Sequence, residues 1–340
     1  MYKIAIAGAS TLLGQEIREA LADSPLAAAN LLLLDEEDAR GQLEQVGDEI
    51  AIVQAIDPEA FDKVDFTFFC GAETLTQKHW RDALRAGSTV LDLSGALDQE
   101  TGVLVRAPWL GTENAADLFT PAVVPAHPAA LALALLLERL TAASPLRAIS
   151  ATVLQPASES GRAAMDELHQ QTVNLLSFQN LPRDVYDAQV AYNLMTGFGE
   201  ATHVNLAVNE ARIRRHVDTL ATGRWPHLAL QLVQAPVFHG YTFSLCAEFE
   251  HPVELVSIEE ALNGDRVDLV LEDTDSPSNL AATGQNEVLV RMRAEREGRN
   301  PQLATRVWLW AAVDNLRLAA QNAIDCAMDL RRLRPAGSVQ

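Results

Sequence analysis

The chain has 340 residues, which is long for one domain and comfortable for two, and its composition is that of an ordinary globular protein. Its 46 Asp and Glu residues outnumber its 26 Lys and Arg residues, and this net charge of −20 disfavours nucleic acid and anionic membranes as partners. No apolar run reaches the roughly 18 residues that suggest a membrane span, and Met1-Tyr2-Lys3 leads at once into an apolar run, so we expect a cytoplasmic protein without a signal peptide.

The first third of the chain alternates apolar strands with amphipathic helices. We predict strands at 2–8, 30–35, 49–54, 64–70 and 88–95, and helices at 13–23 and 76–87. Alternation of this kind is typical of parallel strands joined by right-handed crossovers. The sequence therefore predicts an α/β fold with a Rossmann-type, doubly wound parallel sheet.

The segment IAIAGASTLLGQEI (4–17) joins the first strand to the first helix and has the layout of a dinucleotide loop. Gly8 and Gly14 fit the glycine of the tight turn and the glycine where helix meets strand. Thr11 stands where the loop usually has its middle glycine, and its side chain would crowd a pyrophosphate. A close-packed turn without a ligand is therefore the alternative to a nucleotide site.

Asp35 lies about 20 residues past this loop, where a carboxylate hydrogen-bonds a ribose 2′-hydroxyl and repels a 2′-phosphate. If a dinucleotide binds, NAD is favoured over NADP. An exposed acidic turn is the alternative interpretation of residues 35–38. NADP remains an alternative cofactor because of the nearby Arg40.

At residues 124–128, Val-Pro-Ala-His-Pro joins a short apolar strand to a long apolar helix. Such joints often hold a nucleophile or a phosphate in α/β enzymes, because free N–H groups of the helix point outward. His127 is therefore a candidate functional residue, although little reactive chemistry surrounds it.

The rest of the chain has longer strands and fewer helices. We predict strands at 146–155, within 227–250, at 287–295 and at 306–314, and helices near 161–177, 204–221 and 315–333. These segments predict a mixed sheet that carries substrate contacts and a dimer face. The last helix is long enough to pack back on the first domain.

Metal and disulfide chemistry are not indicated. Cys70, Cys246 and Cys326 are far apart and form no C-x-x-C pair, and the histidines show no H-E-x-x-H spacing. For each cysteine, a small buried residue is the favoured interpretation over a nucleophile.

The chain resembles the aspartate-semialdehyde dehydrogenase family in five segments that follow in the same order: the loop, 90–97, 151–161, 233–245 and 311–323. The resemblance implies a Rossmann domain of 1–126 with 316–340, and an α+β dimerisation domain of 127–315. It also implies an ancestral reaction in which a cysteine thiolate attacks an aldehyde, hydride passes to NADP, and phosphate cleaves the thioester.

The family's catalytic positions have changed in this chain. His127 stands at the nucleophilic cysteine, Tyr241 at the histidine base, and Gln155 is retained. A neutral imidazole is a poor substitute for a thiolate, and a tyrosine with a pKa near 10 is a weak base.

The positions that hold anions in the family have changed as well. Gln234 stands at the arginine for the substrate carboxylate and Asp98 at the arginine for phosphate, while the Glu-x-x-Lys motif ends in Ile213 after Glu210. The cofactor positions implied by the resemblance are Gly8, Ser10, Thr11, Leu12, Leu13, Gly14, Asp35, Ser94, Gly95 and Asn322.

The chain thus resembles the Usg-like paralogues of the family, which lack the catalytic cysteine. We expect a homodimer with a silenced site and a binding role, for example pairing with an active paralogue. An active NAD(P)-dependent semialdehyde dehydrogenase that uses His127 or Tyr241 is one alternative. An NAD-sensing protein and a scaffold with an empty cleft are the others.

Overall fold

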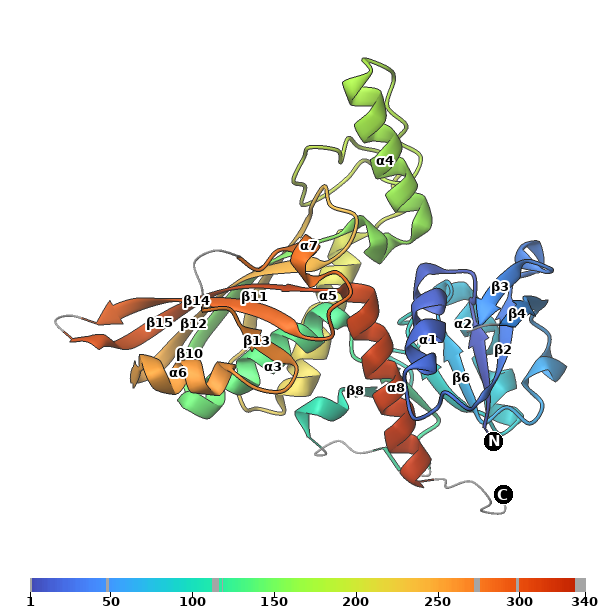
Figure 1. Ribbon diagram of the computed structural model, residues 1–340, viewed down its shortest axis with the longest axis horizontal. Coiled ribbons are helices and arrows are strands. Elements are labelled where there is room, and N and C mark those ends of the chain that lie inside the picture. Colours follow the sequence, from blue (N-terminus) through green and yellow to red (C-terminus); the bar gives the residue numbers. More distant parts are fainter. Residues whose placement is uncertain are drawn as a thin grey trace. The chain divides into compact units, whose positions relative to one another are not determined.

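The computed structural model describes residues 2–46, 49–111, 116–117, 119–271, 276–297 and 300–333. The chain divides into two compact units, the first made of Met1–Ala126 with Ala319–Gln340 and the second of His127–Leu318 (Figure 1). The end of the predicted first domain, residues 334–340, lies outside the described residues.

The first unit contains a seven-stranded parallel sheet with the order β5-β2-β1-β6-β7-β9-β8. Its strands are β1 (Lys3–Ala7), β2 (Asn30–Asp35), β5 (Gln54–Ala55), β6 (Phe66–Phe69), β7 (Thr89–Asp92), β8 (Leu104–Arg106) and β9 (Ala122–Pro125). Its helices are α1 (Leu12–Ala22), α2 (Glu73–Arg85) and the later part of α8 (Asn315–Leu333).

Both faces of this sheet are covered, because alternate residues of each strand point to opposite sides. Ile6 packs in one core cluster with Ile17 of α1 and Ala323 of α8, whereas Ala7 belongs to a second cluster with Leu75 of α2. The predicted doubly wound α/β architecture is confirmed.

The predicted strand 49–54 is wrong as a member of the parallel sheet. β4 (Glu49–Ile52) instead pairs antiparallel with β3 (Leu43–Val46) in a separate two-stranded sheet, and only β5 joins β2. The apolar residues that suggested a buried strand are outside the core, since Ile50 and Ile52 are 72% and 58% exposed. The short strand β8 was not predicted.

The second unit contains a six-stranded mixed sheet with the order β11-β10-β12-β15-β14-β13. Its strands are β10 (Leu146–Gln155), β11 (Leu228–Gln234), β12 (Tyr241–Glu254), β13 (Val267–Leu269), β14 (Val288–Glu297) and β15 (Asn300–Val313). β10 pairs with β11 in parallel and with β12 antiparallel, so the predicted mixed sheet is confirmed.

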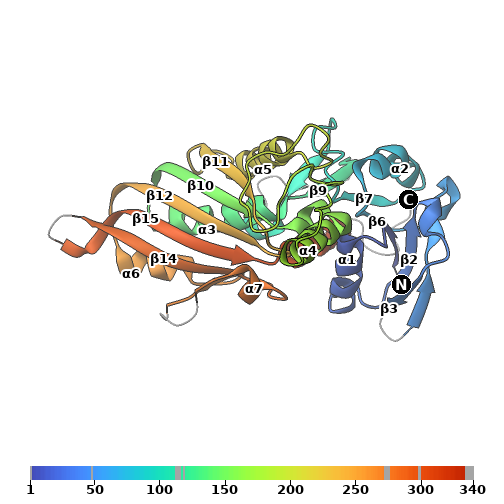
Figure 2. The ribbon, with the colours of Figure 1, turned by 90° about the horizontal axis from the view of Figure 1, so that it is seen from above.

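Helices cover one face of the mixed sheet. They are α3 (Pro128–Ala143), α5 (Leu206–Ala221) and α6 (Leu255–Leu262), and α3 packs against the other two (Figure 2). α3 is apolar on almost every side because it is enclosed by the sheet and these helices. α7 (Asn279–Ala282) contacts β15.

Residues 162–205, which we call the arm, rise from the second unit and consist of α4 (Arg162–Leu176) and the loop before α5 (Figure 1). A separate core, with Leu168 of α4 and Tyr186 of the loop, holds the arm together. Nothing in the described part of the chain is a helix both long enough and apolar enough to cross a membrane.

Candidate active site

His127 is the N-cap residue of α3, and its side chain completes the start of that helix. The imidazole Nδ1 accepts a hydrogen bond from the N–H of Ala129 at 3.2 Å, and Pro128 at the first helical position has no N–H to satisfy. The residue is 2% exposed. The helix terminus that would stabilise a thiolate or a bound anion is therefore partly satisfied by the protein itself.

The other contacts of His127 define the protonation of its ring. Nε2 lies 2.8 Å from Oε1 of Glu159, and the backbone N–H of His127 donates to Nδ1 of His216 at 2.9 Å. Because Nδ1 accepts the Ala129 N–H, the single ring proton of a neutral imidazole lies on Nε2 and is donated to Glu159. A second proton, on Nδ1, would face another N–H group.

Glu159 lies in η4, a single turn of 3₁₀-helix over Ala157–Ser160, and its side chain is 14% exposed. Burial raises its pKa, but the hydrogen bond from His127, the charge of Arg212 and the phenol of Tyr241 together hold the pKa below its usual value. The Glu159 carboxylate is therefore ionised at neutral pH, and it accepts the Nε2 proton of His127.

Tyr241 is the first residue of β12 and is fully buried. Its ring meets the His127 ring edge-on, with 6.0 Å between the two centroids. Burial and the adjacent Glu159 charge raise the pKa of Tyr241 well above its ordinary value, so the phenol keeps its proton. Within the described chain, the phenol oxygen makes no hydrogen bond of good geometry.

Helix α5 supplies two groups to this cluster from one face, since Arg212 and His216 are four residues apart. The Asn205 side chain caps this helix by accepting the N–H of Val208 at 3.1 Å. Glu159, Arg212 and His216 were not among the site residues predicted from the sequence. A charged residue within the family-like segment 151–161 was the available signal for Glu159, whereas the placement of His216 depends on the tertiary fold.

Gln155 and Gln234 form a closed amide network on the neighbouring strands β10 and β11. The Gln155 amide donates to Oε1 of Gln234 at 3.3 Å and accepts from Asn209 at 2.8 Å, and the Gln234 amide donates to backbone carbonyls. Both glutamines are at most 1% exposed. The structure thus brings these two predicted positions together, without a charge on either.

Glu210 and Ile213 do not join that network. Glu210 accepts the backbone N–H of Leu232 at 2.9 Å and the guanidinium of Arg214 at 2.6 Å, which ties α5 to β11. Ile213 is fully buried in the apolar core. Asp98 belongs to the first unit, after β7, where its backbone N–H donates to Gly95.

The glycine loop of the first unit is shaped by backbone packing. A Cβ at Gly8 would lie 2.3 Å from the backbone nitrogen of Gly71, and a Cβ at Gly14 would lie 2.3 Å from the carbonyl oxygen of Gly8. The Thr11 hydroxyl caps α1 by accepting the Gly14 N–H at 3.0 Å. The N–H groups of Leu12 and Leu13 begin the helix and have no intrahelical acceptor, which suits a phosphate.

Asp35 is bound by the loop itself. Its Oδ2 accepts the backbone N–H and the hydroxyl of Ser10 at 2.9 and 2.6 Å, and its Oδ1 accepts the Glu36 N–H at 2.9 Å. Asp35 is 6% exposed. These bonds use three of the roughly four acceptor positions of a carboxylate, so little capacity remains for a ribose hydroxyl.

The other predicted cofactor positions also have internal partners. The Ser94 hydroxyl donates to Asp92 at 2.6 Å, and Gly95 adopts a φ of 88° in the turn that follows. The Asn322 amide is fully buried and donates to the carbonyl of Arg106 at 3.2 Å. The loop geometry fits a dinucleotide phosphate, whereas the Asp35 contacts resemble those of a self-contained turn.

No thiol in the chain is prepared for nucleophilic attack. Burial is the main cause that raises the pKa of Cys70, Cys246 and Cys326, and all three are buried. Among the residues that the structure describes, no group of three or more His, Cys, Asp and Glu could hold a metal ion.

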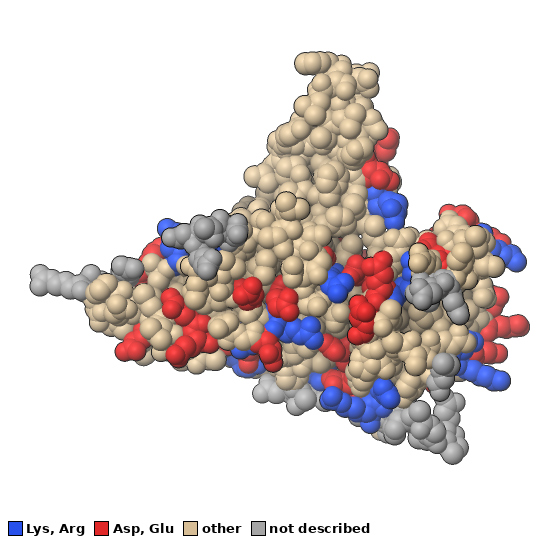
Figure 3. All heavy atoms as spheres, viewed as in Figure 1, with Lys and Arg blue, Asp and Glu red and all other residues tan. Residues whose placement is uncertain are grey.

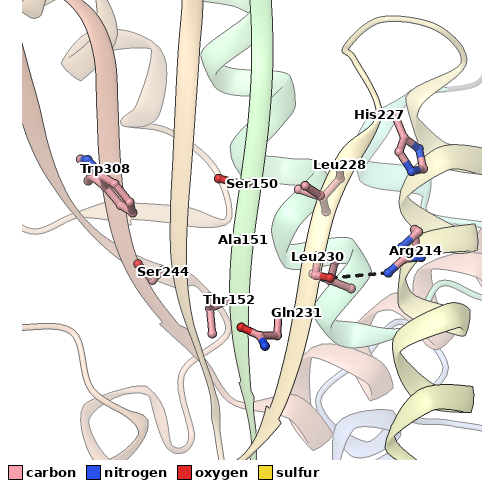
Figure 4. A pocket seen from close by; sticks show the side chains of 11 residues that line it. Ser150, Ala151, Thr152, Arg214, His227, Leu228, Leu230, Gln231, Ser244 and Trp308 are labelled. Carbon is pink, nitrogen blue, oxygen red and sulfur yellow. Dashed lines mark hydrogen bonds between the residues drawn. The ribbon is translucent and has the colours of Figure 1, made fainter. Parts of the chain in front are cut away.

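A hollow of about 580 Å³ lies on the face of the mixed sheet that the helices leave uncovered (Figure 4). Thr152, Ser244 and Trp308 line it from three adjacent strands, and Arg214 lies at its rim with its guanidinium bonded to the Leu230 carbonyl. We call this uncovered face of the sheet, with Thr152, Ser244 and Trp308 at its centre, the open face. Its centre is uncharged.

Comparison with known protein families matches almost the whole chain. Residues 3–128 match the model of the semialdehyde dehydrogenase NAD binding domain, and residues 137–318 match the model of the semialdehyde dehydrogenase dimerisation domain.

Individual relatives carry two kinds of name. The chain is 30% identical to a USG-1 protein homolog of Pseudomonas aeruginosa, over 94% of this chain and 95% of that protein. It is 26% identical to an aspartate-semialdehyde dehydrogenase of Prochlorococcus marinus, over 95% and 94% of the two chains. The crystal structure of aspartate semialdehyde dehydrogenase II from Vibrio cholerae has the same fold, with a TM-score of 0.84, 22% identity, and coverage of 98% of this chain and 99% of that one.

Proposed function

Since the chain belongs to the semialdehyde dehydrogenase family, we propose that it is a catalytically silenced member whose present role is binding rather than turnover. Its relatives include both aspartate-semialdehyde dehydrogenases and USG-1 homologues.

The state of His127 carries the proposal. A nucleophile needs an available lone pair, but the Nδ1 lone pair of His127 is engaged by the Ala129 N–H and Nε2 donates its proton to Glu159. The imidazole is held on both sides and is 2% exposed. His127 therefore acts as a helix cap and a hydrogen-bond donor.

The groups that would assist a nucleophile support the same conclusion. Tyr241 keeps its proton because burial and Glu159 raise its pKa, so it is unsuited to act as a base. The uncharged Gln155–Gln234 network offers amide groups where a substrate carboxylate or phosphate would need cations. NAD or NADP would accept hydride in such a reaction, but these residues provide no way to form the acyl intermediate.

A turnover assay tests the proposal. Purified protein is incubated with aspartate semialdehyde, phosphate and either NAD or NADP, and reduced cofactor is followed by absorbance, with an active relative as positive control. We expect no reduction above background in the wild-type protein or in the His127→Ala variant. Turnover in the wild type that disappears in His127→Ala would overturn the proposal.

For the binding role, we infer that the protein forms a homodimer through its second unit, which matches a dimerisation domain. Two copies that each carry a net charge of −20 repel one another, so they are expected to meet through uncharged surface. The open face supplies such a surface, and residues 168–182 and 188–199 of the arm contain no Asp, Glu, Lys or Arg. Figure 3 shows no Asp, Glu, Lys or Arg atoms on the upper part of the arm in this view. Phe178, which follows α4 in the arm, is 99% exposed.

An active paralogue carrying the same fold is the partner that would give a silenced member a function. Cross-linking in cells, followed by identification of the captured chain, tests this part of the proposal. A heteromer with an active semialdehyde dehydrogenase would support it. A protein found strictly as homodimers in cells that also contain an active relative would contradict it.

For the cofactor, we propose that the first unit prefers NAD to NADP. Glu36, Glu37 and Asp38 follow β2, and Arg40 is paired with Glu37 at 3.0 Å, so carboxylates dominate the place where a 2′-phosphate would lie. Calorimetric titration with both dinucleotides tests the preference. A tighter complex with NADP would contradict the preference. The Glu37→Gln variant is expected to reduce the difference in affinity between NAD and NADP, because it removes the carboxylate paired with Arg40.

A further inference from the structure

Three groups from three different elements converge on the carboxylate of Glu159. The imidazole of His127, at the joint of β9 and α3, places Nε2 2.8 Å from Oε1. Arg212 of α5 acts on the carboxylate through its positive charge, and the phenol of Tyr241 lies beside it at the start of β12. Glu159 itself comes from a fourth element, η4.

This arrangement has the composition of a site for a carboxylate ion. A positive charge, an N–H donor and a phenol beside one carboxylate are the groups with which proteins bind small anions. Tyr241 is fully buried, and in the described structure its oxygen lacks a hydrogen bond of good geometry although it lies beside Glu159. The donors are fixed by the fold, because His127 caps α3 and is also bonded to His216.

We propose that His127, Arg212 and Tyr241 form a binding site for a small monocarboxylate, and that Glu159 fills this site from within the same chain. The inference rests on the proposed function only in treating the His127 cluster as the former reaction centre. It adds a second reason for the loss of activity, because an external carboxylate has to displace a covalently tethered one.

The chemistry of the Glu159 side chain suggests the probe. Truncation to alanine removes the CγH₂ group and the carboxylate, which together have the heavy atoms of acetate. Glu159→Ala therefore leaves a space of the size and charge preference of acetate, lined by the same donors. Glu159→Gln is the matched control, because it removes the charge and keeps the space filled.

The experiment measures thermal unfolding of the full-length wild type, Glu159→Ala and Glu159→Gln in sodium acetate and in sodium chloride at equal ionic strength. A ligand that binds only the folded state raises the melting temperature by mass action. We expect acetate to stabilise Glu159→Ala in a saturable way, and to have the same effect as chloride on the other two proteins. Acetamide, which has the same shape without the charge, is expected to leave Glu159→Ala unchanged.

A second variant assigns the binding to the proposed donors. In Glu159→Ala with Arg212→Gln, the apparent acetate affinity measured by calorimetry is expected to fall roughly tenfold or more, because the positive charge beside the carboxylate is lost. Glu159→Ser is made in parallel in case the alanine variant folds poorly.

If either folded truncation variant responds to acetate no more than to chloride, the proposal is wrong. The outcome is independent of the turnover assay. Acetate binding in a protein that proves to be an active dehydrogenase would overturn the proposed function and leave this inference standing. A protein without turnover whose truncation variants do not bind acetate would overturn this inference and leave the proposed function standing.

Discussion

At the residue scale, His127 makes three different hydrogen bonds. It caps α3 through Nδ1, donates to Glu159 through Nε2, and orients His216 through its backbone N–H. The bond from Ala129 requires an unprotonated Nδ1, and together the three bonds hold the side chain in a single orientation. The same bonds that stabilise the helix start make the residue unsuitable as a nucleophile.

The capping role predicts a specific pattern of stability. His127→Ala removes the acceptor for the Ala129 N–H and the donor to Glu159, and we expect the free energy of unfolding to fall by at least the roughly 1 kcal/mol typical of a lost N-cap. His127→Asn restores a good capping acceptor and is expected to lose less. Urea denaturation of the three proteins checks this order, and equal stability of the alanine and asparagine variants would contradict it.

Glu159 predicts a pH dependence of stability. Its pKa is lowered in the folded state from the ordinary value of 4.5, so its contribution is complete above pH 4.5 and is lost as the pH falls through the folded-state pKa. At neutral pH, Glu159→Gln is expected to be less stable by about 1.5–3 kcal/mol. The two unfolding free energies should converge as the pH falls below the folded-state pKa of Glu159, and a difference that persists unchanged in acid would refute this role.

The sequence could predict the chain positions of several candidate site residues but only part of their contacts. His127, Tyr241, Gln155 and Gln234 were identified from their places in family-like segments, and the structure brings His127 together with Tyr241 and Gln155 together with Gln234. Glu159, Arg212 and His216 were missed because their roles depend on how η4 and α5 pack, which no local pattern encodes.

At the scale of elements, the sequence pattern predicts the place of a helix or strand in the fold where the element is buried, and predicts it wrongly where the element is exposed. α3 was predicted because an unbroken apolar run suits a helix enclosed by a sheet and two other helices. The strand at 49–54 was wrongly assigned to the parallel sheet, because the apolar residues of β4 lie in a separate, exposed two-stranded sheet. Apolar alternation alone does not distinguish these two environments.

The βα turn of the first unit gives a prediction at this scale. A methyl group at Gly14 would lie 2.3 Å from the Gly8 carbonyl oxygen, so Gly14→Ala is expected to destabilise the protein by roughly 1–3 kcal/mol without any dinucleotide present. Gly197→Ala is the control, because a methyl group there meets no atom within 4 Å. Thermal unfolding of both variants tests this prediction. Equal melting temperatures would show that backbone packing does not require a glycine at position 14.

At the scale of the whole molecule, the charge distribution limits how the protein associates. The chain is strongly acidic, yet the centre of the open face and most of the arm are uncharged. The charges of the ion pairs on that sheet balance, since the two arginines Arg147 and Arg306 are bonded to the two glutamates Glu248 and Glu295. Self-association through the second unit therefore avoids most of the repulsion between copies.

A single added charge tests that arrangement. Ser244 lies in the open face beside Thr152 of β10 and Trp310 of β15, and Ser244→Glu would place a carboxylate opposite the same residue of an equally acidic copy. We expect the dimer to dissociate to monomers in sedimentation analysis. Ser257→Glu, on the exposed side of α6, is the control and should leave the dimer intact. A Ser244→Glu protein that stays dimeric would place the interface elsewhere.

The central claim, that no residue of this chain forms an acyl intermediate, is tested most directly by the mass of the intact protein. The protein is mixed with aspartate semialdehyde and an excess of NAD or NADP, without phosphate, so that any acyl group transferred to a side chain would remain attached. We predict an unchanged mass, while an active relative gains the acyl group under the same conditions. A mass increase that maps to His127 or to any of the three cysteines would contradict the account.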